Sequence, residues 1–153
     1  MDPLTREQAL ELLDAVPVAH LGLISDGAPY VTPMSFVVDE ERILFRTTGG
    51  KKLEGMRRDP RVCIEVSKFD PESGEWASVI VNGTAAEVED DRTGQLAISK
   101  LYEKYADSIG NPLSRGGLQP LQGLPHVMEV VIDEITGMSS GSGFSPRTRP
   151  GRL

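Results

Sequence analysis

Cysteine and histidine are scarce in this sequence, and their scarcity excludes two kinds of site. Among 153 residues there are one cysteine, Cys63, and two histidines, His20 and His126. One cysteine cannot form a disulfide within the chain, and a cytosolic location is the default expectation for such a protein. A closed zinc site needs four ligands, so these three residues cannot build one. The sequence therefore predicts neither a structural disulfide nor a bound metal.

Long apolar runs and an excess of positive charge are also missing. The longest apolar runs, 18–24 and 77–81, have the length of strands and fall short of the ~20 residues that a membrane span needs. The first residues lack the basic and apolar segments of a signal peptide. The formal net charge is -7, whereas nonspecific nucleic-acid binding requires a basic surface. We expect a cytoplasmic protein that binds neither membranes nor nucleic acid.

The length and composition are those of one globular domain. A chain of 153 residues can bury a core, and its 25% of charged residues is ordinary for a soluble protein. We place the domain at residues 1–137. Beyond it the sequence is dominated by Ser, Gly, Pro and Arg, so residues 138–153 are expected to form a flexible tail.

Most of the chain has the pattern of strands joined by short turns. Asp26 and Gly27 favour a tight hairpin, and Gly83 is assigned to a bulge that lets a barrel strand bend. Consecutive hairpins favour antiparallel pairing. The sequence therefore predicts a mainly β fold, an antiparallel barrel with flanking helices. Its six expected strands are 18–24, 30–38, 42–48, 61–67, 76–89 and 127–132.

Three helices are expected beside these strands. Thr5 and Gln8 form a capping-box pattern before the first helix, which ends at Pro17. A short helix is expected over 51–58, and the best helical periodicity lies in 91–105. Residues 108–125 are expected to form a long loop, and loops of this length are usually functional or mobile.

One segment combines the residue types that bind phosphate. Residues 45–53 read Phe-Arg-Thr-Thr-Gly-Gly-Lys-Lys-Leu, a strand end followed by two glycines and a helix start. Free amides at a helix N-terminus and glycine-rich turns create an anion site. Arginine, threonine and lysine side chains add charge and hydrogen-bond donors. On these residues alone, a phosphate-monoester site and a plain strand–turn–helix with solvated lysines both stay open.

Together with its neighbours, this segment resembles the core of the pyridoxamine-5'-phosphate-oxidase-like split barrels. In that family the helix start is followed by Asn/Asp-Pro-Arg-Val, which here is 59–62. The run 26–35 is similar to the family's preceding hairpin, and 79–87 to its later strand. The resemblance covers roughly residues 5–135, and the order and spacing of the motifs make it specific.

The resemblance implies a six-stranded split barrel that forms a homodimer, with FMN in a groove between the subunits. It also implies roles for particular residues. Ser78 would lie near the flavin, while Trp76 could stack on the ring system or anchor the barrel or the dimer. The residues implied to hold the cofactor phosphate are Arg46, Thr47, Thr48, Lys51 and Lys52, and those implied to run along the isoalloxazine ring are Pro33, Met34 and Ser35.

The implied function is a flavin-dependent oxidoreductase that acts on a small organic substrate, with the cofactor supplying the chemistry. Residues 130–137 lack the Arg-x-His element of the true pyridoxamine-phosphate oxidases, so the namesake activity is not expected. The nitroimidazole-resistance branch is similar over 57–63 but has a histidine where this chain has Arg46. A deazaflavin-dependent reductase and a non-catalytic flavin or heme binder are the alternatives. No acid or base stands out as catalytic.

We expect the cysteine and the two histidines to have structural roles or to lie at the surface. Cys63 lies between Val62 and Ile64 and is expected to be a small buried hydrophobe. His20 is expected to be a hydrogen-bonded structural histidine, and His126 a surface histidine.

Overall fold

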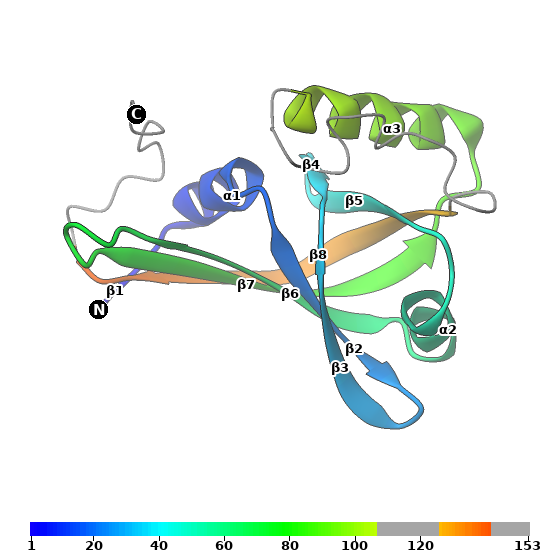
Figure 1. The fold of residues 1–153 in the computed structure, drawn as a ribbon, viewed down its shortest axis with the longest axis horizontal. Coiled ribbons are helices and arrows are strands. Elements are labelled where there is room, and N and C mark those ends of the chain that lie inside the picture. The colour runs from blue at the N-terminus through cyan, green and yellow to red at the C-terminus, as the bar shows by residue number, and fades with distance from the viewer. Residues whose placement is uncertain (107–125, 142–153) are drawn as a thin grey trace.

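Alternating apolar and polar residues build one antiparallel sheet in the computed structural model, which describes residues 1–106 and 126–141. Three helices accompany eight strands (Figure 1). In chain order the elements are β1 (Asp2–Pro3), α1 (Arg6–Ala15), β2 (Ala19–Ser25), β3 (Ala28–Met34), β4 (Val37–Asp39), β5 (Arg42–Thr47), α2 (Lys51–Arg58), β6 (Arg61–Phe69), β7 (Trp76–Glu87), α3 (Asp91–Tyr105) and β8 (His126–Ser139).

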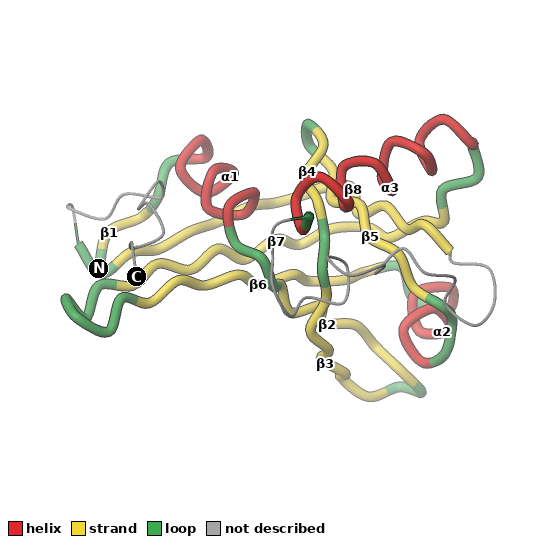
Figure 2. The backbone as a smooth tube through the Cα atoms, turned by 45° about the horizontal axis from the view of Figure 1, so that its top comes forward, coloured by secondary structure: helices red, strands yellow, loops and turns green. Residues whose placement is uncertain are grey.

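The order of the strands makes the sheet a barrel. Neighbouring strands follow the order β3-β2-β6-β7-β8-β5-β4, and β1 pairs with β8. The two ends of this order, β3 and β4, are consecutive in the chain and are separated only by Ser35 and Phe36. The sheet therefore has to curl until its ends meet at this corner, as the path of the backbone shows (Figure 2). The predicted mainly β, antiparallel barrel is confirmed.

The core lies inside the curled sheet. Inward-facing residues such as Leu21, Phe45 and Val79 are at most 1% exposed. Helix α1 adds Leu12 and Leu13 to this cluster. A second cluster lies between α3 and the outer side of β4 and β5, where α3 runs along the barrel (Figure 1). Burial of each large apolar side chain contributes roughly 1.5–3 kcal/mol, so the two clusters fix both helices on the sheet.

Local signals located the helices accurately. Thr5 and Gln8 form the reciprocal hydrogen bonds of a capping box at 2.9 and 3.1 Å. Helices α2 and α3 begin and end at the predicted residues. The Asp26-Gly27 hairpin is also confirmed, because both residues have positive φ and Ser25 pairs with Ala28.

The strand count is eight rather than six because one predicted strand is interrupted and one short strand was missed. The strand expected over 30–38 divides into β3 and β4 at Ser35 and Phe36. The backbone N–H of Phe36 donates to the Tyr105 hydroxyl at 3.0 Å. This N–H is therefore not available for hydrogen bonds between strands. Strand β1 consists of two residues that pair with the far end of β8.

The last strand is much longer than predicted. It was expected over 127–132, but β8 runs from His126 to Ser139 and pairs with β7 along this length. The register shifts between Asn82 and Gly83, where the irregularity was predicted, but the extra residue is Asp133 on β8 and not Gly83 itself. Strand β8 thus extends two residues past 137, where the domain was expected to end and the tail to begin. The expected loop at 108–125 and the tail from 142 lie outside the described residues.

Cys63 is exposed, not buried as expected. Its neighbours Val62 and Ile64 face the core, so strand alternation turns Cys63 outward. Its Sγ lies over Gly22, where a Cβ would be only 2.6 Å away. No helix in the described ranges is long and apolar enough to cross a membrane.

Candidate functional site

The junction between β5 and α2 has the backbone geometry of an anion site. Gly49 and Gly50 adopt φ values of 113° and 80°, which side-chain-bearing residues rarely adopt. Gly50 is the N-cap of α2, and no side chain caps the helix there. The first N–H groups of α2 therefore have no partner within the helix. These donors, together with the positive end of the helix dipole, favour a negatively charged ligand.

Two cations at this junction have no counter-ion among the described residues. Arg46 and Lys52 are half-buried, and burial lowers the pKa of both groups. Within residues 1–106 and 126–141, neither forms an ion pair with a carboxylate. By contrast, Arg57 pairs with Glu87 on β7. A partly desolvated charge without a partner is costly, so the junction is electrostatically complementary to an anion.

Strand alternation separates two of the predicted phosphate ligands. Arg46 shares a face of β5 with Leu44, which packs under α3, whereas Thr47 shares the opposite face with Phe45 in the core. Thr47 is 7% exposed and Thr48 is exposed. Side chains of Arg46 and Thr47 therefore do not share one face, although both residues lie at the end of β5 beside α2.

Lys51 connects this junction to β3. Its Nζ lies 5.7 Å from the centre of the Tyr30 ring. Pro33 and Ser35 follow Tyr30 along the chain by three and five residues, or roughly 10 and 17 Å at the usual rise of a strand. Pro33 is exposed, while Met34 is 8% exposed and belongs to the core. We call residues 33–35 the ring strip.

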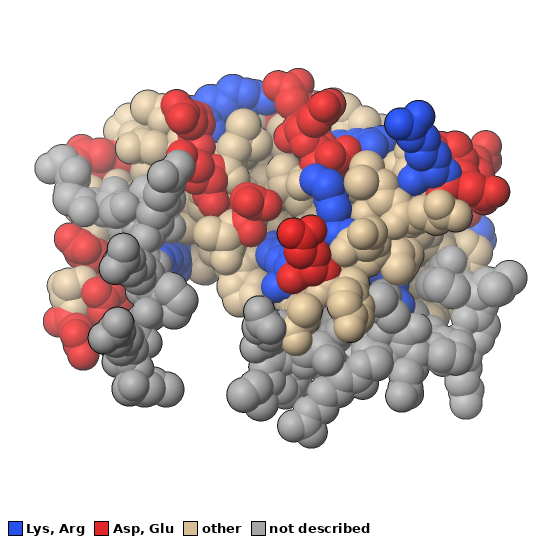
Figure 3. Space-filling model, turned by 90° about the horizontal axis from the view of Figure 1, so that it is seen from above, with Lys and Arg blue, Asp and Glu red and all other residues tan. Residues whose placement is uncertain are grey.

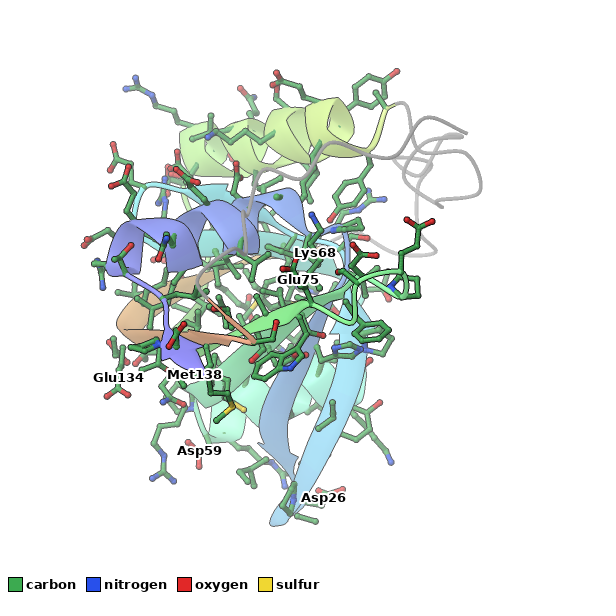
Figure 4. The ribbon with its side chains drawn as sticks, turned by 90° about the vertical axis from the view of Figure 1, so that its left-hand side faces the viewer. Asp26, Asp59, Lys68, Glu75, Glu134 and Met138 are labelled. Carbon is green, nitrogen blue, oxygen red and sulfur yellow. The ribbon has the colours of Figure 1, made fainter. Side chains whose placement is uncertain are left out.

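Trp76 and Ser78 lie on the same outer face as Pro33 but several strands away. Pro33 is opposite His20, His20 opposite Glu65, and Glu65 opposite Ile80, which puts these residues on one face. Three strand spacings of roughly 4.8 Å separate Pro33 from Ile80. Trp76 and Ser78 precede Ile80 on β7, near the β6–β7 turn that Lys68 and Glu75 mark in Figure 4. Within this chain they therefore do not meet the ring strip.

Two contacts between a histidine and a carboxylate lie near these segments, and the sequence did not predict their partners. His20 Nδ1 lies 3.0 Å from Glu65 Oε2, beside Pro33 on the outer face. The predicted hydrogen bond of His20 is confirmed, but the side chain is half exposed to solvent. The two residues are 45 positions apart, so only the pairing of β2 with β6 brings them together.

His126 forms the second contact, at the end of the barrel that holds α2. It is half-buried and lies opposite Thr47, with its Nδ1 3.6 Å from Glu87 Oε2. Arg57 donates to the same carboxylate, and this hydrogen bond is the main reason that the pKa of Glu87 is lowered. Glu87 thus ties α2 to the start of β8 and supports the junction from the side.

A cavity of about 620 Å³ lies next to this network. This pocket is open to solvent and lies between the end of β7, the first turns of α3 and the start of β8. Its lining combines Val88, Ile98 and Val127 with the carboxylates of Glu87, Glu89 and Asp90. On the face that carries α1 and α3, acidic and basic side chains are interspersed (Figure 3). Among the described residues no group of three or more His, Cys, Asp or Glu side chains could hold a metal ion.

Comparison with known proteins places the chain in a family. A family model described as pyridoxamine 5'-phosphate oxidase matches residues 5–139. The chain belongs to this family, which confirms the resemblance drawn from its motifs.

Individual relatives are similar over nearly the whole chain. An uncharacterized protein of Rhizobium meliloti is 26% identical over 149 residues, covering 92% of this chain and 95% of the relative. The crystal structure of an FAD-binding protein from Mesorhizobium loti is 25% identical, with a TM-score of 0.71 over 92% of this chain and 98% of that chain. An FAD-binding protein from Mycobacterium smegmatis is also 25% identical, with a TM-score of 0.61 over 90% of this chain and 96% of the other.

Proposed function

We propose that this protein is a cytoplasmic, homodimeric flavoprotein that binds FMN and transfers electrons to a small organic substrate. The observation that carries the proposal is the pair of half-buried cations, Arg46 and Lys52, without a carboxylate partner in the described chain, beside the uncapped start of α2. The flavin, when bound, supplies the redox chemistry. The chain supplies charge, position and control of access.

The phosphate of the cofactor is expected at the β5–α2 junction. The free N–H groups of α2 would donate to its oxygens, and Lys51 and Lys52 would add charge-assisted hydrogen bonds. Arg46 would contribute its positive charge from the other face of β5. The flavin ring is placed along residues 33–35 by the resemblance to the family, and Lys51 lies beside Tyr30 of the same strand.

A second copy of the chain completes this arrangement. Ser78 and Trp76 lie three strands from Pro33 in one protomer but on the same outer face. That face also exposes Val31 and Ile80, which are 66% and 48% exposed. Exposed apolar side chains on the outer face of a sheet favour association with another surface. A dimer formed through this face would bring Ser78 and Trp76 of one copy toward the ring strip of the other.

Absorption and mass analysis of the purified protein test which flavin it binds. We expect the purified chain to retain flavin absorption bands through gel filtration, or to acquire them when FMN is added. Mass analysis of the released cofactor distinguishes FMN from FAD, which two similar structures are described as binding. A colourless protein that takes up neither flavin would contradict the proposal. Titration with the deazaflavin coenzyme and with heme would then decide between the alternatives.

The phosphate site is tested by charge removal. In the double variant Lys51→Ala, Lys52→Ala we expect flavin affinity to fall about a hundredfold or more, because two charge-assisted contacts are lost. Arg58→Ala is the matched control, since it removes one charge from the other end of α2, where Arg58 is exposed and 3.5 Å from Asp26. Equal affinity in the double variant and the control would refute this site. Circular dichroism of both variants confirms that α2 is intact.

Turnover is tested separately from binding. If the protein is an oxidoreductase, NADH or NADPH should bleach the bound flavin without oxygen, and a small organic acceptor should restore its colour. A flavin that neither nucleotide reduces would favour the non-catalytic binder.

A further inference from the structure

The last turn of α3 holds the corner between β3 and β4. Tyr105 is completely buried, and its hydroxyl accepts the backbone N–H of Phe36 at 3.0 Å. The same hydroxyl lies 2.8 Å from the carbonyl oxygen of Pro17 and 3.1 Å from that of Phe36, and it can donate to one of them at a time. Tyr105 therefore joins α3 to the corner and to the segment that leads into β2.

Lys104 completes this contact. Its Nζ donates to the carbonyl oxygen of Phe36 at 3.1 Å and lies 3.7 Å from the centre of the Phe36 ring. A cation at that position interacts favourably with the ring face. Both backbone polar groups of Phe36 are thus bonded to α3. This is why the strand ladder is interrupted at the corner.

We call the contacts of Lys104 and Tyr105 with Phe36 the clamp. The ring strip ends directly at this clamp. Ser35 is the last residue of the strip and precedes Phe36, whose side chain is 0% exposed. Because the position of Phe36 is fixed by its buried ring and by two residues of α3, the direction in which the chain leaves β3 after Met34 is fixed as well. A ligand that lies along residues 33–35 binds more tightly when the backbone groups of these residues are already held in one arrangement.

We propose that Lys104 and Tyr105 are positioning residues that hold the ring strip in the arrangement required for flavin binding. The proposal rests on the proposed function, because it assigns the clamp to the strip along which the flavin ring is expected. Neither residue would touch the cofactor. Both would act through the backbone of Phe36.

The clamp is expected to respond to pH through Lys104. The charged groups around it are Asp14 on α1 and Lys100 and Glu103 on α3, while Val37 and Val38 of β4 are apolar. Lys100 is already paired with Asp39 at 3.2 Å. Burial lowers the pKa of Lys104 to about 8. Above that pH the neutral amine donates a weaker hydrogen bond and loses its attraction to the Phe36 ring, so the clamp loosens.

Flavin titration of K104M tests this inference, with K100M as the matched control one helical turn away. At pH 7 we expect K104M to bind flavin roughly tenfold more weakly than wild type, and K100M to bind within about twofold of it. Wild-type affinity should fall above about pH 8 toward that of K104M, whose own profile should lack this step. Equal affinities, or identical pH profiles of wild type and K104M, would overturn the inference.

Hydrogen exchange of the cofactor-free protein examines the clamp itself. The amide of Phe36 should exchange faster in K104M and in Y105F than in K100M at the same pH. An unchanged rate in both clamp variants would refute the clamp even if flavin binds. Conversely, a wild-type protein that takes up no flavin would refute the proposed function, while the exchange rates would still decide whether α3 holds the corner.

Discussion

The hydroxyl of Tyr105 and the backbone N–H of Phe36 are 3.0 Å apart and join positions 69 residues apart in the chain. This hydrogen bond replaces one that Phe36 would otherwise make within the sheet. As a result, a segment with continuous strand character bends at Ser35 and Phe36 and passes from one end of the sheet order to the other. A single side chain on α3 thus takes part in closing the barrel.

Removing that hydroxyl should destabilise the protein. In Tyr105→Phe the N–H of Phe36 is left buried without its partner, which costs about 1–3 kcal/mol of unfolding free energy. Tyr102→Phe provides the control, because Tyr102 is 54% exposed and its change should stay within about 0.5 kcal/mol. Urea unfolding of both variants measures the difference. If Tyr105→Phe were as stable as the control, the hydrogen bond would not hold the corner.

Close packing at α2 predicts that alanine substitution has different effects on stability at two helical glycines, Gly55 and Gly94. A Cβ at Gly55 would lie 2.5 Å from Leu23 Cδ1 and 2.7 Å from the carbonyl oxygen of Ile24, so Gly55→Ala must push α2 away from β2. We expect a loss of about 1–3 kcal/mol in stability and weaker flavin binding, because Lys51 and Lys52 move with the helix. At Gly94 on α3 nothing lies within 4 Å of a Cβ.

Gly94→Ala should therefore be neutral or stabilise the protein by up to about 1 kcal/mol, since alanine favours the helix. Thermal unfolding of the two variants compares them directly. Similar melting temperatures would show that α2 tolerates displacement from the barrel.

Lys104 should make stability depend on pH in the alkaline range. Its folded-state pKa of about 8 lies below the ordinary value of 10.5, so between these two pH values the unfolded chain binds more protons than the folded chain. The contribution of Lys104 to the unfolding free energy therefore rises as pH increases from about 8 to 10.5, by up to roughly 3 kcal/mol. Comparison with K104M across this range isolates the effect from other groups.

The two alkaline effects of Lys104 have opposite signs. Global stability should rise relative to K104M, because burial of the neutral amine costs less, while flavin affinity should fall, because the contact to Phe36 weakens. If affinity and relative stability changed in the same direction, Lys104 would be a buried lysine without a positioning role.

The proposed dimer face can be disrupted with one charge. Ile80→Lys places a cation among the exposed residues of that face and should shift the protein toward monomers in sedimentation velocity. Flavin affinity should fall with it, because Ser78 and Trp76 of the second copy are lost from the site. Leu96→Lys on α3, where Leu96 is 37% exposed, should leave the assembly unchanged. A dimer that persists in Ile80→Lys would place the interface elsewhere.

Much of the fold was predictable because its signals are local. Helices α2 and α3 follow from periodicity and from the residues that flank them, and the Asp26-Gly27 turn follows from the freedom of these residues to adopt positive φ. The glycines and lysines of the anion junction are also consecutive in the chain. Motif order then sufficed to recognise the family, which the match over residues 5–139 confirms.

Errors in the sequence-based prediction arose where distant residues decide the structure. Strand β8 is longer than predicted because it pairs with β7 as far as Ser139, through polar positions such as Glu134 and Thr136 that carry no strand signal of their own. Cys63 was placed inside because both neighbours are apolar, although alternation along β6 turns it outward.

The sequence by itself determined the class of this protein, a mainly β fold with two glycines and two lysines at a helix start, since turns, caps and periodicity depend on residues close in the chain. Only the tertiary structure decided that His20 meets Glu65 and that α3 holds Phe36. Those relationships depend on strand register and helix packing, which bring together residues that no local pattern connects.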